Sequence, residues 1–347
     1  MGKVLKYKKF IIAILLIGIV ELFKRVTFLT DLYTDHIYPV LFKLLHNISG
    51  VLPFSIYDVL VVAAILLLAS GICFIWFRRY RSGYLKTILL SLMWIYIWFY
   101  FGWGINYFGK DFYERSSIEK AKYDSLQYDT FVHKFCDSLN STYSSENRYM
   151  TGNELRIEVY SLYDTICSKY NLPTLPENFS TKEMLFPRIY AAVGVTGYYG
   201  PLLAEVHHNS YLLPVEEPFT MAHETAHLLG ITSEAEANLY AYLVTTSSQD
   251  RATRFSGYFQ VMPYILNNYR KSVNDSTYRI LFKQIKPEIM DLYKEERNHW
   301  NSLKVERANS VQNVAHNTYL KINNIPQGIT NYSEVVALIL SVYTNTK

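Results

Sequence analysis

Hydrophobic residues are concentrated in three runs within the first 109 residues of the chain. The second run, Ser55–Phe77, carries Asp58 as its only charge, and the third, Tyr84–Phe108, has no charge after Lys86. Both exceed the roughly 20 residues that an α-helix needs to cross the hydrocarbon core of a bilayer. The pattern therefore predicts two membrane-spanning helices, at about 55–77 and 84–108.

The first run, Phe10–Val20, is shorter and follows a cluster of N-terminal lysines, a pattern also found in signal peptides. Charged residues, beginning with Glu21, come after it in place of a small-residue cleavage site. We therefore expect an uncleaved first span over about residues 10–28, with a cleaved signal peptide as the alternative.

Aromatic and charged residues near the ends of these runs suggest where the membrane surface lies. Trp94, Trp98 and Trp103 are typical of the aromatic belts found at membrane interfaces. Asp58 lies near the outer end of its run, and we expect it at the interface, although a carboxylate inside a membrane would indicate function.

Basic residues predict how the three helices are oriented. The N-terminal lysines mark one cytoplasmic segment, and the cluster Arg78–Arg81 marks the connection between the second and third spans as another. The connection 27–54 has Lys43 as its only Lys or Arg and is expected outside. Residues 110–347 then also lie outside the cytoplasm.

From Lys110 onward the mixture of polar and apolar residues is that of a globular domain. Amphipathic or buried helices are expected over residues 111–139, 153–169, 218–229, 233–247, 253–268 and 287–299, and in the long stretch after Trp300. Short strands are expected at 188–195 and 205–212, and loops at 141–146, 171–178 and 194–201. The sequence thus predicts a membrane domain, 1–109, followed by one α+β domain, 110–347, in which helices dominate.

Composition and charge narrow the class of protein. Hydrophobic residues make up 50% of the chain and charged residues 18%, which excludes a disordered or fibrous protein. Residues 1–109 carry 11 Lys and Arg against 4 Asp and Glu, whereas residues 110–347 carry 23 against 26. The basic excess lies in the membrane part, so no basic patch indicates nucleic-acid binding.

The three cysteines are too few for a disulfide scaffold or a cysteine-based zinc site. Cys136 and Cys167 either pair outside the cytoplasm or remain buried thiols, and the sequence favours neither alternative.

The segment His223-Glu224-Thr225-Ala226-His227 carries the clearest chemistry in the chain. Histidines four residues apart share one face of a helix, where both imidazoles can bind a single zinc ion. Glu224, beside the first histidine, can then act as general base toward a zinc-bound water. Pro218 suits the first turn of such a helix, and Gly230 suits its left-handed end.

A catalytic zinc site needs a third protein ligand and an open position for water. Ser233 and Glu236 are predicted to form a capping box at the start of the next helix, which gives Glu236 a structural role. Glu234 is therefore the expected third ligand, and Asn238, one turn further on, is expected to orient it or a histidine. The alternative is that Glu236 binds the metal and Glu234 only caps the helix.

Further candidates precede the motif. The predicted strand 205–212 is expected at a sheet edge, where an extended peptide can pair with it; its candidate residues are Glu205, His207, His208 and Tyr211. The candidates for stabilising an oxyanion beside the metal are Tyr198, Tyr199 and His208.

Two resemblances rest on these residues. The segment Glu234–Asn238, Glu-x-x-Ala-Asn, resembles the Glu-x-x-Ala-Asp signature of membrane gluzincin peptidases of the prenyl-protein and heat-shock type. It departs from that signature in its final Asn and in lying only seven residues after His227. The wider layout resembles a bacterial domain-of-unknown-function family of predicted membrane metallopeptidases. The segments that carry this second resemblance are the three N-terminal spans, Trp103–Tyr107, His223–Asn238, Tyr319–Lys321 and Asn331–Val336.

Together these features predict a zincin-like, membrane-anchored metallopeptidase that hydrolyses peptide bonds outside the cytoplasm through a zinc-activated water. Zn²⁺ is bound by His223, His227 and Glu234, and Glu224 is the catalytic base. The protein is expected in the inner membrane as a multi-pass protein with a cytoplasmic N-terminus, and the resemblance implies a periplasmic domain 110–347. Its expected partners are the lipid bilayer and a peptide or protein substrate.

Two other functions are compatible with the sequence. The first is a non-catalytic, zinc-stabilised membrane sensor or scaffold, in which His207 or His208 closes a four-ligand site. The second is a membrane assembly protein in which the histidine motif is accidental.

Overall fold

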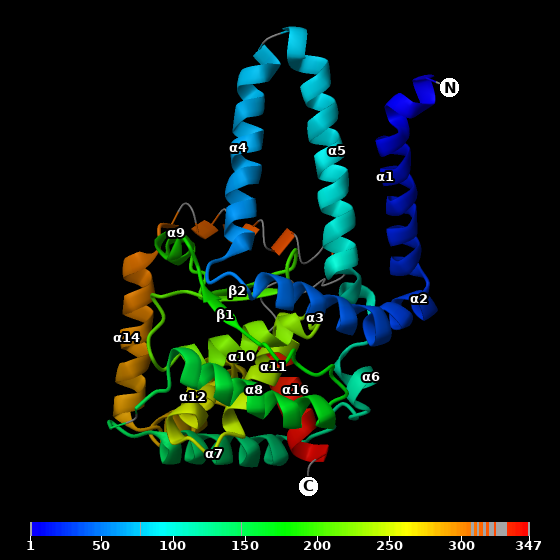
Figure 1. The fold of residues 1–347 in the computed structure, drawn as a ribbon. Helices are drawn as coiled ribbons and strands as arrows, with labels where there is room; N and C mark the ends of the chain where they lie inside the picture. The colour runs from blue at the N-terminus through cyan, green and yellow to red at the C-terminus, as the bar shows by residue number, and fades with distance from the viewer. Residues whose placement is uncertain are drawn as a thin grey trace.

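The computed structural model describes residues 2–76, 78–146, 148–306 and 332–345, with some residues between 309 and 323. Of the sequence features noted above, Tyr319–Lys321 and Asn331 lie outside the described residues. Helices dominate this part of the chain and surround one small sheet (Figure 1). The predicted helix-dominated α+β architecture is therefore observed.

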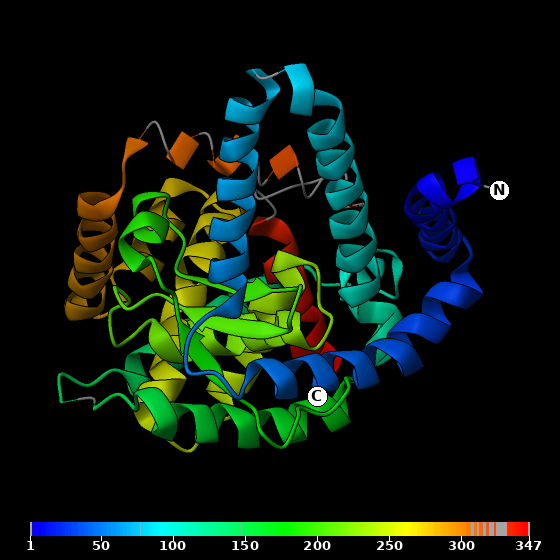
Figure 2. The same cartoon turned by 45° about the horizontal axis from the view of Figure 1, so that its top comes forward.

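Three N-terminal helices stand upright above the helical body in Figure 1. They are α1 (Gly2–Arg25), α4 (Ile56–Trp76) and α5 (Arg78–Gly102). In Figure 2, α1 is seen nearly along its axis, whereas the other two remain upright. Within the described part of the chain, Gly83–Gly102 has the length and apolar composition needed to cross a membrane, and Ile56–Gly71 is a shorter apolar helix.

The connection between α1 and α4 is helical and lies across the base of the upright helices (Figure 1). It consists of α2 (Thr27–Leu32), a π-helical turn (Tyr33–Ile37) and α3 (Tyr38–Ser49). One face of α3, including Tyr38, Phe42, Leu45 and His46, is buried against the body.

The third apolar run is not one helix to its end. Helix α5 stops at Gly102, and a 3-10 turn (Gly104–Phe108) leads to α6 (Phe112–Ser116). Gly104 permits this turn to pack closely, because a Cβ there would lie 2.6 Å from the Phe99 ring. The prediction of an interfacial belt was wrong for Trp103, which is buried in the body, whereas Trp94 and Trp98 are exposed.

The remaining helices form the body beneath the upright helices (Figure 1). They are α7 (Ser125–Thr142), α8 (Gly152–Lys169), α10 (Glu217–Leu228), α11 (Glu234–Thr246), α12 (Arg251–Ser272), α13 (Asp275–Phe282), α14 (Pro287–Leu303) and α16 (Tyr332–Asn345). The single helix predicted over 111–139 is instead divided into α6 and α7. Ser117, with φ of 56°, ends α6, and Asp124 caps the start of α7.

The sheet has three short strands in the order β1-β3-β2, namely β1 (Thr181–Glu183), β3 (Glu205–His208) and β2 (Gly197–Gly200). Strand β3 is therefore central, and its prediction as an edge strand was wrong. Its antiparallel partner β2 lies in the predicted loop 194–201, with Tyr199 opposite Val206. The predicted strand 188–195 is largely the helix α9 (Pro187–Ala192), because Pro187 occupies the first turn of a helix without loss of a hydrogen bond.

The hydrophobic core is shared between the upright part of the chain and the body. Tyr33, Phe42 and Trp103 belong to the same buried cluster as Leu228 and Tyr240. Cys136 and Cys167 are buried free thiols, so they do not pair.

Buried polar groups hold the base of α4 to the sheet. Asp58, expected at an interface, is 1% exposed and accepts hydrogen bonds from the hydroxyls of Tyr190 (2.6 Å) and Tyr198 (2.7 Å). The Glu205 carboxylate accepts the backbone N–H of Tyr57 at 2.8 Å and pairs with Lys182 at 2.5 Å. These contacts place the start of α4 next to the sheet, whose strand β3 leads to α10.

Candidate metal centre

Two consecutive helices position the candidate ligands. Helix α10 carries Pro218 in its first turn, and Gly230, with φ of +93°, reverses the chain after it. Helix α11 begins at Glu234, where the Ser233 hydroxyl accepts the N–H of Glu236 at 3.4 Å. Because the connection is so short, the start of α11 lies against the second half of α10.

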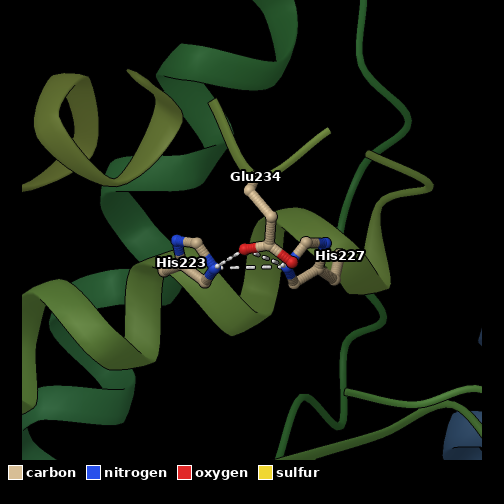
Figure 3. A group of neighbouring side chains, drawn as sticks. All are labelled: His223, His227 and Glu234. Atoms are coloured by element: carbon tan, nitrogen blue, oxygen red, sulfur yellow. Dashed lines mark hydrogen bonds and ion pairs between the residues drawn. The ribbon is translucent and has the colours of Figure 1, made fainter. Parts of the chain in front are cut away.

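This arrangement brings His223, His227 and Glu234 together (Figure 3). The two Nε2 atoms are 3.2 Å apart. Glu234 Oε2 lies 3.2 Å from Nε2 of His223 and 3.8 Å from Nε2 of His227. Each of the three offers one ligand atom, and these atoms all lie within 4.8 Å of one another. Among the described residues, this is the group of side chains that could hold a metal ion.

Hydrogen bonds at the far side of each ring orient the histidines. His223 Nδ1 lies 3.0 Å from Asn238 Oδ1, and His227 Nδ1 lies 2.6 Å from the backbone oxygen of Ile231. Oxygen acceptors require each Nδ1 to carry the proton, so each neutral ring presents its Nε2 lone pair to the centre of the cluster. This is the tautomer that a metal-binding histidine needs. Of the two partners considered for Asn238, a histidine or Glu234, the structure places His223 within hydrogen-bonding distance of its Oδ1.

The charges of the cluster favour a cation or a bound proton at its centre. Burial opposes the charged form of His227, but the Glu234 carboxylate raises the pKa of His227 to about 9. Burial likewise opposes ionisation of Glu234, and the two histidines hold its pKa well below the usual range. A proton or a cation can therefore occupy the point on which the two Nε2 atoms and the carboxylate converge. Two imidazoles and one carboxylate fit the ligand preference of zinc.

Glu236 has a different role from Glu234. Its carboxylate accepts the backbone N–H of Phe112 at 3.1 Å and pairs with Arg115. The predicted capping box is therefore only half formed, because the Glu236 side chain is turned toward α6 and away from Ser233. The geometry places Glu234, and not Glu236, beside the histidines.

Glu224 is buried beside the cluster, 6% exposed. Burial raises the pKa of its carboxyl, while His223 and His227 act in the opposite direction. Strand β2 lies directly against it: a Cβ on Gly197 would be 2.7 Å from Glu224 Oε1 and 2.9 Å from Thr220 Cγ2. Only glycine fits at position 197 without displacing the carboxylate, a constraint that the sequence did not reveal.

The cluster opens into a cleft of about 1010 Å³. Glu224 and the three clustered residues form its floor, and strand β2 contributes Gly197, Tyr198 and Tyr199. Helix α12 contributes Gln260 and Tyr264, and α5 contributes Ile95 and Phe99.

The tyrosines and histidines predicted near the motif differ in how close they lie to the cleft and the ligands. Tyr199 lines the cleft, and its hydroxyl lies 3.3 Å from that of the buried Tyr38. Tyr198 donates its hydroxyl to Asp58, and its ring stacks on His207 at 4.2 Å. Nε2 of His207 lies 3.5 Å from Glu205, and the described ligand cluster includes neither His207 nor His208.

Two contacts near the cluster went unnoticed in the sequence. The indole N–H of Trp103 donates to the backbone oxygen of His227 at 3.0 Å. The Tyr264 hydroxyl accepts from Asn238 Nδ2 at 3.4 Å, behind His223. Neither contact has a local signal, since each joins segments far apart in the chain.

The fold and the cluster define a helical protein with two upright apolar helices and a His-His-Glu group at the floor of a cleft. Residues 33–340 match the model of the family described as "Protein of unknown function (DUF3810)", so the chain belongs to this family. Neither a curated protein nor a solved structure matches the chain. The matched range includes α5, the cleft and every residue of the cluster.

Proposed function

We propose that this protein is a membrane-anchored zinc metallopeptidase whose active site is the cluster on α10 and α11. The observation that supports it most is the convergence of two correctly oriented Nε2 atoms and the Glu234 carboxylate beside a buried Glu224. A structural zinc site has no need of a second carboxylate there, whereas peptide hydrolysis requires a base. This favours an enzyme over a zinc-stabilised sensor or scaffold.

Zinc bound by His223, His227 and Glu234 would supply an acidic water and polarise a substrate carbonyl. The chain's own residues would transfer the proton and position the ligands and the substrate. Glu224 accepts a proton at its carboxylate and returns it to the leaving amine. Asn238 and the Ile231 carbonyl hold the histidines in place, and Gly197 allows a substrate-facing strand to lie next to the base.

Strand β2 is the proposed substrate-binding strand in place of β3. One edge of β2 pairs with β3, and the strand itself lines the cleft. An extended peptide can add to the free edge of such a sheet through main-chain hydrogen bonds. That placement would bring its backbone past Glu224.

We further propose that α1, α4 and α5 all cross the inner membrane, with the N-terminus cytoplasmic and the body in the periplasm. Outward side chains on α1 and α4, such as Ile14, Leu15 and Leu66, are more than 60% exposed. Apolar surface of this kind on three neighbouring helices is stable in lipid and costly in water.

The test uses the full chain purified in detergent and exposed to zinc, with a pool of quenched decapeptides as substrate. We expect about one zinc per chain and slow hydrolysis of the pool. His223→Ala should lose the metal, whereas His133→Ala, a surface change, should not. Glu224→Gln should keep the metal and lower turnover by about 10² or more.

Two outcomes would contradict the proposal. A folded wild-type chain without zinc would remove the metal site. Zinc binding without any hydrolysis by the wild-type chain would favour the sensor or scaffold instead.

A further inference from the structure

The cleft is not confined to the helical body. Its wall includes Ile95 and Phe99 of α5 and Tyr57 at the start of α4. Ile95 lies about two turns, or about 10 Å, before the end of α5, inside the apolar segment Gly83–Gly102. A helix long enough to cross a membrane therefore forms one end of the candidate active site.

The outer face of α3, together with the residues that flank this helix, is apolar. Its side chains recur every three or four residues and are exposed by 41 to 80%: Ile37 and Val51 beside the helix, and Val40, Leu44 and Ile48 within it. The opposite face is buried, and the helix lies across the base of α4 and α5 (Figures 1 and 2). An exposed apolar stripe next to apolar upright helices suits a helix lying in the membrane interface, with the stripe against acyl chains.

Parts of the cleft wall differ in chemistry. Ile95, Phe99 and Trp103 make the wall at α5 apolar and aromatic. Gln260 of α12, Lys304 and Asn309 make other parts of the wall polar. A substrate matching both kinds of wall has an apolar segment that continues into a polar one.

We infer that the site acts on polypeptides anchored in the membrane and cuts them in the segment that leaves the outer surface of the bilayer. This inference rests on the proposed function. A chain emerging beside α5 passes Ile95, Phe99 and Trp103 before it reaches His227 and the other ligands. A freely diffusing peptide would not need a cleft wall built from a membrane-crossing helix.

The first test measures docking without hydrolysis. The full chain carrying Glu224→Gln is reconstituted in vesicles with zinc, and a photo-crosslinking amino acid replaces Ile95 or, as control, Leu92. Both positions are exposed on α5, by 49 and 52%, but Leu92 does not line the cleft. A decapeptide pool bearing a dipalmitoyl anchor should be captured from position 95 and not from position 92. Equal capture from both positions, or none from 95, overturns the inference.

The second test measures hydrolysis of the same pool, anchored or free, by the wild-type chain in vesicles. Anchoring alone concentrates substrate at the vesicle, so the decisive comparison is between variants. Ile95→Asn should lower the ratio of anchored-pool cleavage to free-pool cleavage about tenfold or more relative to Leu92→Asn. Cut sites should lie near the anchor.

The outcomes separate the two proposals. If position 95 captures the anchored pool but neither pool is hydrolysed, the proposed peptidase activity is contradicted. The inference that membrane-anchored chains dock at α5 is then still supported. If both pools are hydrolysed, Ile95→Asn has no effect and the cut sites are spread along the anchored chain, the proposed peptidase activity is supported. The inference that the substrate is membrane-anchored is then overturned.

Discussion

Trp103 donates its indole N–H to the backbone oxygen of His227, which joins the end of α5 to the helix that carries both histidines. Tyr38 makes a parallel connection, because its hydroxyl donates to the backbone oxygen of Leu228 at 2.8 Å. Its ring also lies against Gly230, where a Cβ would come within 2.9 Å. The N-terminal part of the chain thus supports the cluster directly.

A first prediction concerns the fragment 110–347, which the sequence predicts as a separate domain. Removing residues 1–109 would uncover the apolar surface that Tyr38, Phe42 and Trp103 bury and would leave the end of α10 without those contacts. We expect the fragment to aggregate or to bind zinc far more weakly than the full chain. Gel filtration and elemental analysis of both proteins would test this. A monomeric fragment with one zinc would show that the N-terminal support is dispensable.

A second prediction distinguishes the two neighbouring glutamates. Glu234→Ala should abolish or strongly weaken zinc binding, and once the metal is removed it should cost less folding stability than Glu236→Ala, since the Glu234 side chain is 36% exposed and that of Glu236 is 11% exposed. Glu236→Ala should leave Arg115, whose side chain is 17% exposed, without its carboxylate partner, at a cost of up to about 3–5 kcal/mol. Its zinc content per folded chain should stay close to that of wild type.

Zinc titration and unfolding of the metal-free proteins test both halves of that comparison. If Glu236→Ala loses the metal and Glu234→Ala loses stability, the ligand assignment is reversed.

The histidine cluster was predictable because its determinants are local. The spacing of His223 and His227, the left-handed Gly230 and the Ser233 cap all act within one or two turns of helix. The role of Glu236 was half missed because its partner Arg115 lies more than 100 residues earlier in the chain. No local pattern distinguishes a carboxylate that caps its own helix from one that binds a distant arginine.

The sheet was predicted poorly for a related reason. Strand β2 has four residues with glycine at both ends, and its conformation comes from pairing with β3 and from packing against Glu224. The apolar segment 188–195 has the stronger strand-like composition, but Pro187 starts a helix there. Likewise, Trp103 has the composition of a membrane-interface residue, and only tertiary packing reveals its contact with His227.

A third prediction tests the close approach of β2 to the base. Gly197→Ala places a methyl group 2.7 Å from Glu224 Oε1, so either the strand or the carboxylate must move. We expect peptide hydrolysis to fall by about tenfold or more, because small displacements of catalytic groups have large effects on rate, while zinc content is retained. Gly83→Ala, at a glycine with open space around it, is the matched control. Unchanged hydrolysis by Gly197→Ala would mean that β2 does not set the position of Glu224.

A fourth prediction concerns a pair of buried carboxyls away from the ligands. Glu216 accepts the indole N–H of Trp300 at 2.6 Å and the backbone N–H of Leu213 at 2.7 Å. Burial and the nearby Glu296 raise the pKa of Glu216 to about 8, and burial also raises the pKa of Glu296. The pair therefore keeps a proton in the folded protein at a pH where the unfolded chain has released it.

The direction of the pH dependence follows from that difference. Between pH 4.5 and about 8 the folded state binds more protons than the unfolded state, so the free energy of unfolding falls as pH rises. For one proton the slope approaches about 1.4 kcal/mol per pH unit. Glu296→Gln offers Glu216 an amide donor in place of a shared proton. The fall in the free energy of unfolding between pH 4.5 and about 8 should therefore become less steep. Glu288→Gln, an exposed change on the same helix, should keep it. Denaturant unfolding in detergent from pH 5 to 9 provides the measurement, and equal slopes for wild type and Glu296→Gln would show that the two carboxyls share no proton.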